Sequence, residues 1–299
     1  MPGGTEMIPG GPPRPRNIFS GPGRGMSELK LKKFNMSSIH DDSVVVLLGK
    51  RNTGKSYVMK DLLSKHTSIP LGVVISPTES ANAFFGKFVP KMFIHDEFKP
   101  AIVDNVVRRQ KAVMSTMNDE VDNFGTSNVD PRGFLILDDC MFDSKWTKDV
   151  NMRYLFMNGR HVKCMLLITM QYPLGMPPIL RSNVDYTFIL REPSLQNRRR
   201  IFDSYAGMFN SFDLFCTVLD QSTNNYECLV IDNRVQSNRL EDQVYWYKAP
   251  SPPAQYKLCD PQYWALDKQC RRVDGGKTTE VFDLDKLKKA KINVKVVKT

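Results

Sequence analysis

The sequence is poor in the residues that would build a disulfide framework, a zinc site or a membrane span. Its six cysteines include no C-x-x-C pair and its four histidines are scattered, which favours buried thiols in a reducing compartment and no structural metal. No apolar run approaches the roughly 18 residues of a membrane span, and the N-terminus lacks the apolar core of a signal peptide. We therefore expect a protein that works inside a cell and has no membrane span.

Both ends of the chain differ in composition from its middle. Residues 1–27 are rich in glycine and proline, which predicts a disordered arm. Residues 249–299 open with a proline-rich stretch and end in a lysine-rich one, which predicts a linker and an irregular basic tail. Residues 28–248 are expected to form one domain. The formal net charge of +10 favours an anionic partner such as nucleic acid, with an ordinary basic surface as the alternative.

Short apolar runs alternate with helical patterns through the middle of the chain. Runs that are apolar at nearly every position are typical of parallel strands covered on both faces, and the repeated order of strand and helix predicts a doubly wound, mainly parallel α/β fold. Two amphipathic helices and two late strands are expected to extend it. The expected strands are 44–48, 72–76, 134–138, 164–169, 186–190, 227–231 and 243–247, and the expected helices are 55–66, 100–117, 147–158 (closed by Gly159), 195–206 and 208–220.

The segment GKRNTGKS, residues 49–56, matches the phosphate-binding pattern G-x-x-x-x-G-K-[ST]. It lies between a predicted strand and a predicted helix, which is the context that the motif requires. Its glycines allow backbone N–H groups to point at phosphate oxygens, Lys55 is placed to reach the β- and γ-phosphates, and Ser56 is placed to bind Mg²⁺. The predicted nucleotide-binding residues are Gly49, Lys50, Arg51, Asn52, Thr53, Gly54, Lys55, Ser56 and Tyr57.

An acidic pair comes directly after the apolar run 134–137. One carboxylate at the end of a strand is needed to hold Mg²⁺, and a second beside it can act as the general base that activates water. We assign Asp138 to the metal and Asp139 to the water. The alternative interpretation is an ordinary turn-forming pair of aspartates.

Gln171 lies just past another buried run, 164–169. An amide at this point can hydrogen-bond the attacking water or the γ-phosphate and so report hydrolysis to the rest of the protein. Ligands of open parallel sheets bind at the edge formed by the carboxyl ends of the strands. Because Gly49, Asp138 and Gln171 all come at or after the ends of their strands, we expect all three to lie on this edge.

Arg160 and Arg181 precede predicted strands, so we expect them toward the opposite edge. An arginine there cannot easily reach the γ-phosphate of its own chain, but it can act as an arginine finger on a neighbouring subunit. The alternative for either residue is an ordinary salt bridge. A basic group made of Arg191 and residues 197–200 is a candidate DNA contact, with a solvated helix face as the alternative.

Taken together, the phosphate-binding loop, the acidic strand end ILDD and the stretch GRHVKCMLLITMQYP resemble the FtsK–HerA superfamily of P-loop ATPases. In that superfamily an arginine precedes an apolar strand that ends in a threonine and a glutamine, here Arg160, Thr169 and Gln171. The downstream stretch PPILRSNVDYTFILRE resembles the viral branch, the genome-packaging ATPases of nucleocytoplasmic large DNA viruses. The resemblance covers roughly residues 40–235. The acidic pair is Asp-Asp where the superfamily often has Asp-Glu. The side chain of Asp139 is shorter than that of a glutamate and reaches less far, which weakens its assignment as the base.

The resemblance implies a RecA-like (ASCE) core that hydrolyses ATP with Mg²⁺ and pulls double-stranded DNA, without sequence specificity, into a capsid. It further implies a homo-oligomeric ring, partners among capsid or portal-vertex proteins, and a location in the host cytoplasm at viral factories, with the virion as a second site. The implied catalytic residues are Lys55, Asp138, Asp139, Gln171 and Arg160, and the implied Mg²⁺ ligands are Ser56 and Asp138.

Three other kinds of protein share a phosphate-binding loop of this type. A GTPase of the common type requires an N-K-x-D tetrad, and the sequence has none. In a nucleotide kinase the acidic strand usually comes directly after the helix that follows the phosphate-binding loop. Here another predicted strand, 72–76, lies between that helix and the acidic strand. A nucleotide-gated scaffold for virion assembly, without translocase activity, is the alternative that remains.

Overall fold

In the computed structural model, residues 29–140, 144–274 and 277–282 are described. The chain divides into two units, residues 1–30 and 31–299, and the fold given below is that of the second. The predicted arm 1–27 and the lysine-rich end of the chain lie outside the described residues. No helix among the described residues is long and apolar enough to cross a membrane.

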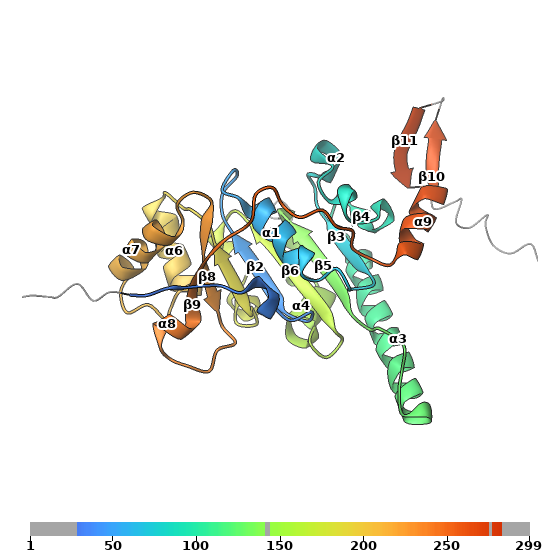
Figure 1. Cartoon of the computed structure of the whole chain (residues 1–299), viewed down its shortest axis with the longest axis horizontal. Coiled ribbons are helices and arrows are strands. Elements are labelled where there is room, and N and C mark those ends of the chain that lie inside the picture. Colours follow the sequence, from blue (N-terminus) through green and yellow to red (C-terminus); the bar gives the residue numbers. More distant parts are fainter. Residues whose placement is uncertain (1–28, 141–143, 275–276, 283–299) are drawn as a thin grey trace, which may run out of the picture. The chain divides into compact units, whose positions relative to one another are not determined.

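Within the described residues the main sheet has nine strands in the order β1-β9-β8-β7-β2-β6-β5-β3-β4 (Figure 1). The strands from β7 to β4 are mutually parallel, β8 runs antiparallel to both of its neighbours, and β1 pairs parallel with β9. The strands are β1 (Lys32–Lys33), β2 (Val44–Leu48), β3 (Gly72–Ile75), β4 (Ile94–His95), β5 (Gly133–Asp138), β6 (Cys164–Met170), β7 (Tyr186–Ile189), β8 (Glu227–Asp232) and β9 (Val244–Lys248).

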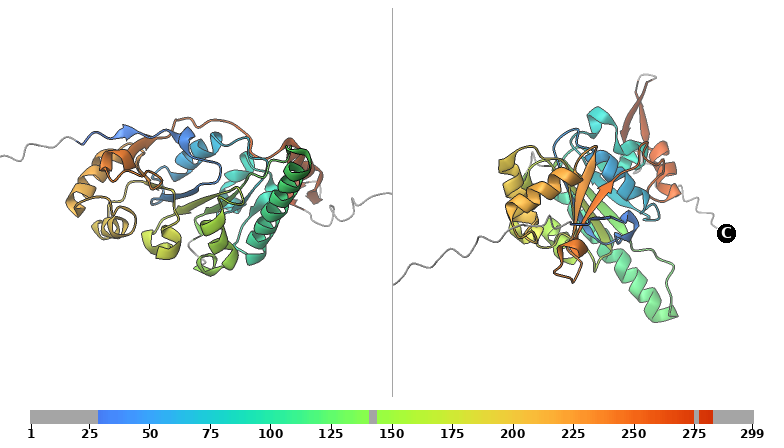
Figure 2. Two further views of the ribbon diagram at one scale, coloured as in Figure 1. Left: turned by 90° about the horizontal axis from the view of Figure 1, so that it is seen from below. Right: turned by 60° about the vertical axis from the view of Figure 1, so that its left-hand side comes forward.

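Helices cover both faces of this sheet. Figure 2 shows α1 on one face and α3 and α4 on the other, as expected when right-handed crossovers run in opposite directions along a sheet. The predicted doubly wound, mainly parallel fold is therefore confirmed. The helices are α1 (Lys55–Ser64), α2 (Glu79–Asn82), α3 (Pro100–Phe124), α4 (Val150–Asn158), α5 (Pro178–Arg181), α6 (Leu195–Tyr205), α7 (Phe212–Ser222), α8 (Leu240–Gln243) and α9 (Pro261–Gln269).

The core explains why the strands are apolar at nearly every position. Alternate side chains of β2, such as Val45 and Leu47, pack with Met59 and Leu62 of α1, while Val46, which points to the other face, is also fully buried. Gly72 lies where β3 passes Phe134 of β5, because a β-carbon at Gly72 would come within 2.1 Å of that ring. Space, rather than backbone freedom, therefore requires this glycine.

The segment after residue 248 is more regular than the sequence predicts. It contains helix α9 and a hairpin of β10 (Arg271–Asp274) and β11 (Lys277–Phe282). Residues before and within α9 also bond to the α/β core: the Leu258 N–H donates to the Phe88 carbonyl at 2.8 Å, and the Met92 N–H donates to the Asp267 carboxylate at 2.9 Å. Helix α9 and the β10–β11 hairpin are thus regular elements where the sequence predicts an irregular segment, and contacts with a distant part of the chain hold α9.

The cysteines match the prediction of buried thiols. All six are free, and five of them are buried, with Cys216 half-buried. Burial raises the pKa of the Cys164 thiol to about 12 and that of Cys259 to about 12. These thiols are therefore protonated and unreactive at neutral pH.

A charged cluster joins the N-terminal ends of β2 and β5. The guanidinium of Arg132 donates to Asp41 at 2.5 Å and to both oxygens of Asp130, and it also bonds Ser68. Its hydrogen bonds hold the pKa of Asp130 below the ordinary value. Burial raises the pKa of Asp41, but hydrogen bonds from His66 and Arg132 outweigh that effect and lower it overall.

We expect Arg132→Ala to lower the free energy of unfolding at pH 7 by about 1 kcal/mol, because the cluster is partly exposed. A carboxylate whose folded pKa is lowered stabilises the protein above its unfolded pKa, and the contribution is lost as the pH falls through the folded value. Urea denaturation curves of wild type and variant should therefore converge between about pH 4 and pH 2. Arg108→Ala, which removes an exposed pair with Asp104, is the matched control and should cost less than about 0.5 kcal/mol.

Candidate nucleotide-hydrolysis site

The loop between β2 and α1 has the backbone of a phosphate cradle. Asn52 and Gly54 adopt left-handed conformations, with φ of 62° and 102°, and the Thr53 hydroxyl closes the loop by donating to the Lys50 carbonyl at 2.7 Å. Gly54 is the N-cap of α1 and has no side chain to cap it. The first amide groups of the helix are thereby left for an anion, and the helix dipole favours one there.

Lys55 places its ammonium group over the loop. Its Nζ donates to the carbonyls of Gly49 and Lys50. Burial lowers the pKa of Lys55, while the charges of Asp139 and Asp138 oppose that shift. The ammonium group of Lys55 therefore lies near enough to the acidic pair for its charge to be felt there.

The first aspartate of the pair is held by two hydroxyl groups. Thr169 Oγ1 donates to Asp138 Oδ1 at 2.7 Å, and Ser76 Oγ donates to Oδ2 at 3.0 Å. Burial raises the pKa of Asp138, and both hydrogen bonds oppose that shift. A fixed, half-buried carboxylate next to a lysine is a suitable anchor for a metal–phosphate complex.

The second aspartate is bonded directly to the predicted sensor. Gln171 Nε2 donates to Asp139 Oδ2, and the Asp139 N–H donates to Thr169 Oγ1 at 3.0 Å. Asp139 has a φ of 52°, an uncommon conformation for any residue other than glycine, asparagine or aspartate. The turn after β5 thus brings this carboxylate to the amide at the end of β6.

The loop itself is tied to β6, since the Gly49 N–H donates to the Met170 carbonyl at 3.0 Å. The sheet order puts β6 between β2 and β5, so Gln171 lies between the loop and the acidic pair. The expected meeting of Gly49, Asp138 and Gln171 at one edge is thus what the structure has. The catalytic roles of these residues stay predictions.

The residues present fit a magnesium ion. Carboxylate and hydroxyl oxygens are the hard donors that Mg²⁺ prefers, and Asp138 is already oriented by Thr169 and Ser76. Asp138 and Ser56 would hold the ion, and the ion would neutralise part of the negative charge of the phosphates. Among the described residues, no group of three or more His, Cys, Asp or Glu side chains could hold a metal by itself.

Arg160 lies away from this site. Its guanidinium donates to Asp185 Oδ1, and Asp185 Oδ2 accepts from the N–H of Val44, the first residue of β2. Arg160 is therefore one strand length from Gly49, at the opposite edge as predicted, and it makes the salt bridge that was the alternative to a finger. Arg181 donates to the Met176 carbonyl at 2.9 Å. A role in trans stays a prediction for both arginines.

The predicted DNA-contacting cluster on α6 is partly neutralised within the chain. Arg198 makes a two-pronged ion pair with Asp220, with one N–O distance of 2.9 Å, and Arg199 pairs with Asp203 at 3.2 Å. Arg200 lies over the ring of Tyr172, 5.3 Å from its centroid. Arg191 is exposed at the end of β7.

Sequence reasoning gave no place in the site to Ser76 and Glu192, and it named Thr169 only as part of a strand motif. Thr169 and Ser76 obey the rule that found Gln171, because they lie at or just past the ends of parallel strands. Glu192 lies past the end of β7 in the same way; it is buried, yet it pairs with Lys50 of the loop at 2.9 Å. It also accepts from the N–H of Ser194, the N-cap of α6, at 2.9 Å, so one carboxylate links the loop to that helix.

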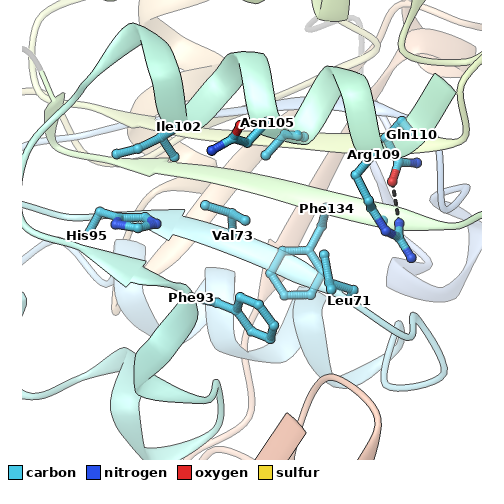
Figure 3. Close-up of a pocket in the computed structure, with 11 residues that line it drawn as sticks. Leu71, Val73, Phe93, His95, Ile102, Asn105, Arg109, Gln110 and Phe134 are labelled. Atoms are coloured by element: carbon cyan, nitrogen blue, oxygen red, sulfur yellow. Dashed lines mark hydrogen bonds between the residues drawn. The ribbon is translucent and has the colours of Figure 1, made fainter. Parts of the chain in front are cut away.

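A cavity of about 300 Å³ lies elsewhere, between the first half of α3 and the strands β3 and β5 (Figure 3). Its lining is mostly apolar, with Phe93, Phe134 and Ile102 among the residues, and His95 and Arg109 lie at its border. It does not include the loop or the acidic pair. The candidate site at the edge of the sheet is thus separate from this cavity.

Comparison with known proteins places the chain among viral proteins. No protein-family model matches it. An uncharacterized protein of Acanthamoeba polyphaga mimivirus is 37% identical over 224 residues, which are 75% of this chain and 78% of the relative. An uncharacterized protein of Frog virus 3 (isolate Goorha) is 34% identical over 260 residues, 86% of this chain and 77% of the relative. The chain therefore belongs to a family of proteins found in nucleocytoplasmic large DNA viruses. This is the viral branch that its sequence resembles.

Members of this viral family are also found in invertebrate iridescent viruses, where a protein of Invertebrate iridescent virus 6 is 37% identical over 70% of this chain and 78% of its own length. Among solved structures, the genome packaging NTPase B204 from Sulfolobus turreted icosahedral virus 2, in complex with sulfate, has a TM-score of 0.49 and 17% identity. That comparison covers 71% of this chain and 98% of B204.

Proposed function

We propose that this viral protein is a Mg²⁺-dependent ATPase that pumps double-stranded DNA into a capsid. The observation that carries the proposal is the convergence of the phosphate cradle, the Asp138–Asp139 pair and Gln171 at one edge of the sheet. The chain belongs to a protein family of large DNA viruses, and this supports packaging of the viral genome as the role of the ATPase. A homo-oligomeric ring, capsid or portal-vertex partners, and action in the host cytoplasm and in the virion complete the proposal.

In the proposed reaction, the backbone of the loop and Lys55 bind the triphosphate. Asp139 accepts a proton from a water molecule whose oxygen attacks the γ-phosphorus, and the bond to the β-phosphate oxygen breaks to release ADP. Gln171 orients the water together with Asp139, to which its amide is bonded. Departure of phosphate would change the hydrogen bonds of Gln171 and Lys50. Lys50 is connected through Glu192 to α6. This connection provides a path from hydrolysis to the basic helix.

The proposal predicts ATP turnover that rises in the presence of linear duplex DNA. The contact is to phosphates, so we expect similar stimulation by unrelated sequences and a steep loss as salt is raised from about 50 to 200 mM. The measurement is phosphate release by the full-length chain with Mg²⁺, with and without long duplex DNA, alongside the native mass of the assembly.

Single-stranded DNA of equal nucleotide concentration is the matched control and should stimulate less. Stoichiometric ATP binding without turnover, even with long duplex DNA, would contradict the motor and favour a nucleotide-gated scaffold. Turnover that is indifferent to DNA in an assembled ring would retain the ATPase and overturn the translocase.

A further inference from the structure

The connection between α7 and β8 contains a tight turn with an unusual residue in it. Asn225 and Tyr226 have φ of 50° and 64°, and the Glu227 N–H donates to the Asn224 carbonyl at 2.9 Å. Positive φ at both central residues defines a type I′ turn, whose second central position favours glycine. Asparagine tolerates this region, whereas a large aromatic residue there is strained. The turn therefore carries a tyrosine at a conformational cost.

The tyrosine borders the phosphate-binding loop. A β-carbon built at Gly54 would lie 3.5 Å from both Cβ and Cδ1 of Tyr226, and 3.8 Å from Cδ2 of Leu190. Gly54 directly precedes Lys55, so Tyr226 touches the loop at the residue that leads into α1. Loop and turn are thus in contact although they are far apart in the sequence.

The ring of Tyr226 is nevertheless open to solvent, with 68% of the residue exposed. No aromatic or cationic side chain in the part of the chain that the structure describes stacks on it. Packing within the subunit therefore does not explain why a strained turn holds an aromatic residue. A ligand that covers the ring when the loop is filled does explain it.

We propose that the Tyr226 ring stacks on the base of the nucleoside triphosphate, an inference that rests on the proposed function because it requires a nucleotide in the loop. The phosphates occupy the backbone of residues 49–56, so the nucleoside lies on a surface that flanks the loop, and Tyr226 supplies an exposed aromatic face there. Every base has a π-face, so stacking adds affinity without selecting the base. Tyr226 is thus a binding residue that raises affinity for nucleotides in general.

The test compares ATP with inorganic tripolyphosphate, which has the phosphates but no base. With the full-length chain and Mg²⁺, calorimetry should show that Tyr226→Gly weakens ATP binding about tenfold and leaves tripolyphosphate binding unchanged. The melting temperature should not fall, because glycine relieves the strain of the turn and offsets the greater freedom of the unfolded chain.

Two matched variants separate the ring from the turn. Asn225→Gly relaxes the same turn and keeps the ring, so ATP affinity should equal that of wild type, and Tyr226→Phe should also keep it. Tyr57→Ala removes another exposed ring near the loop, 49% exposed on the first turn of α1, and should have the smaller effect.

Equal losses for ATP and tripolyphosphate in Tyr226→Gly would overturn the inference, since the ring would then support the loop and not the base. Unchanged ATP affinity in that variant, or a larger loss in Tyr57→Ala, would overturn it as well, while leaving the proposed ATPase intact. Failure of the wild-type chain to bind ATP would overturn both.

Discussion

Replacing Lys55 with alanine is expected to abolish ATP hydrolysis, with a loss of at least about 10²–10³-fold in turnover. The ammonium group of Lys55 now donates to the carbonyls of Gly49 and Lys50, and it is half-buried beside the acidic pair. A cation fixed in this position needs little rearrangement to meet phosphate oxygens and the charge that develops on them in the transition state. The measurement is steady-state phosphate release at saturating ATP, with duplex DNA, together with the dissociation constant of ATP.

Lys65→Ala is the matched control for this variant. Lys65 is the C-cap of the same helix, and its ammonium group pairs with Asp61 at 3.5 Å, far from the loop. This substitution should leave turnover at the wild-type level. Full activity of Lys55→Ala would contradict the assignment of the phosphate cradle, and a melting temperature lowered by more than about 5 °C would point to a folding defect instead.

The edge of the sheet at which the site lies could be predicted from the sequence because it depends on strand direction alone. Each of the central strands is buried on both faces, so its apolar run marks its limits to within one or two residues, and the residues after the run must lie at the carboxyl edge. The predictions for Gly49, Asp138 and Gln171 needed no knowledge of strand order. Their contacts did need it, because Gln171 meets Asp139 only since β6 is the neighbour of β5.

Other parts of the site depend on contacts between residues far apart in the sequence. Ser76 and Asp138 are 62 positions apart, and neither a serine nor a threonine at a strand end is unusual by itself. In the sequence Glu192 is one more charged residue, and its burial depends on contacts with Lys50 of the loop and with the start of α6. Tyr226 is a still clearer case, because its strained backbone cannot be read from sequence.

Helix α3 shows the same limit for the fold. The sequence predicts a helix over 100–117, and the structure extends it to Phe124. The last buried residue of the helix is Gln110, so no face of its second half is covered. A helix that buries no face needs no regular apolar stripe, and the sequence pattern that predicts a helix is therefore weak there. The helix ends at Gly125, whose φ of 75° is the usual left-handed helix end.

Asp139→Asn is expected to slow hydrolysis by about 10²–10⁴-fold while ATP binding stays within about threefold of wild type. The carboxylate is the proposed base, and an amide of the same size cannot accept the proton of the attacking water. Asparagine is also the substitution that the backbone tolerates best, since Asp139 has a φ of 52° and asparagine is enriched in that region. Alanine would add strain and confuse the result.

Asp138→Asn is the matched comparison. It also removes one negative charge from this turn, but it changes the proposed metal ligand and leaves the proposed base in place. It should raise the Mg²⁺ concentration needed for half-maximal turnover, whereas Asp139→Asn should lower turnover at every Mg²⁺ concentration. Gln171→Ala should have a smaller effect, and in combination with Asp139→Asn it should add little, because the two bonded side chains act as one unit on the same water. Retention of turnover in Asp139→Asn, with loss in Asp138→Asn, would transfer the role of base to Asp138. The shorter Asp-Asp pair would then differ in mechanism from the Asp-Glu pair of the superfamily that the sequence resembles.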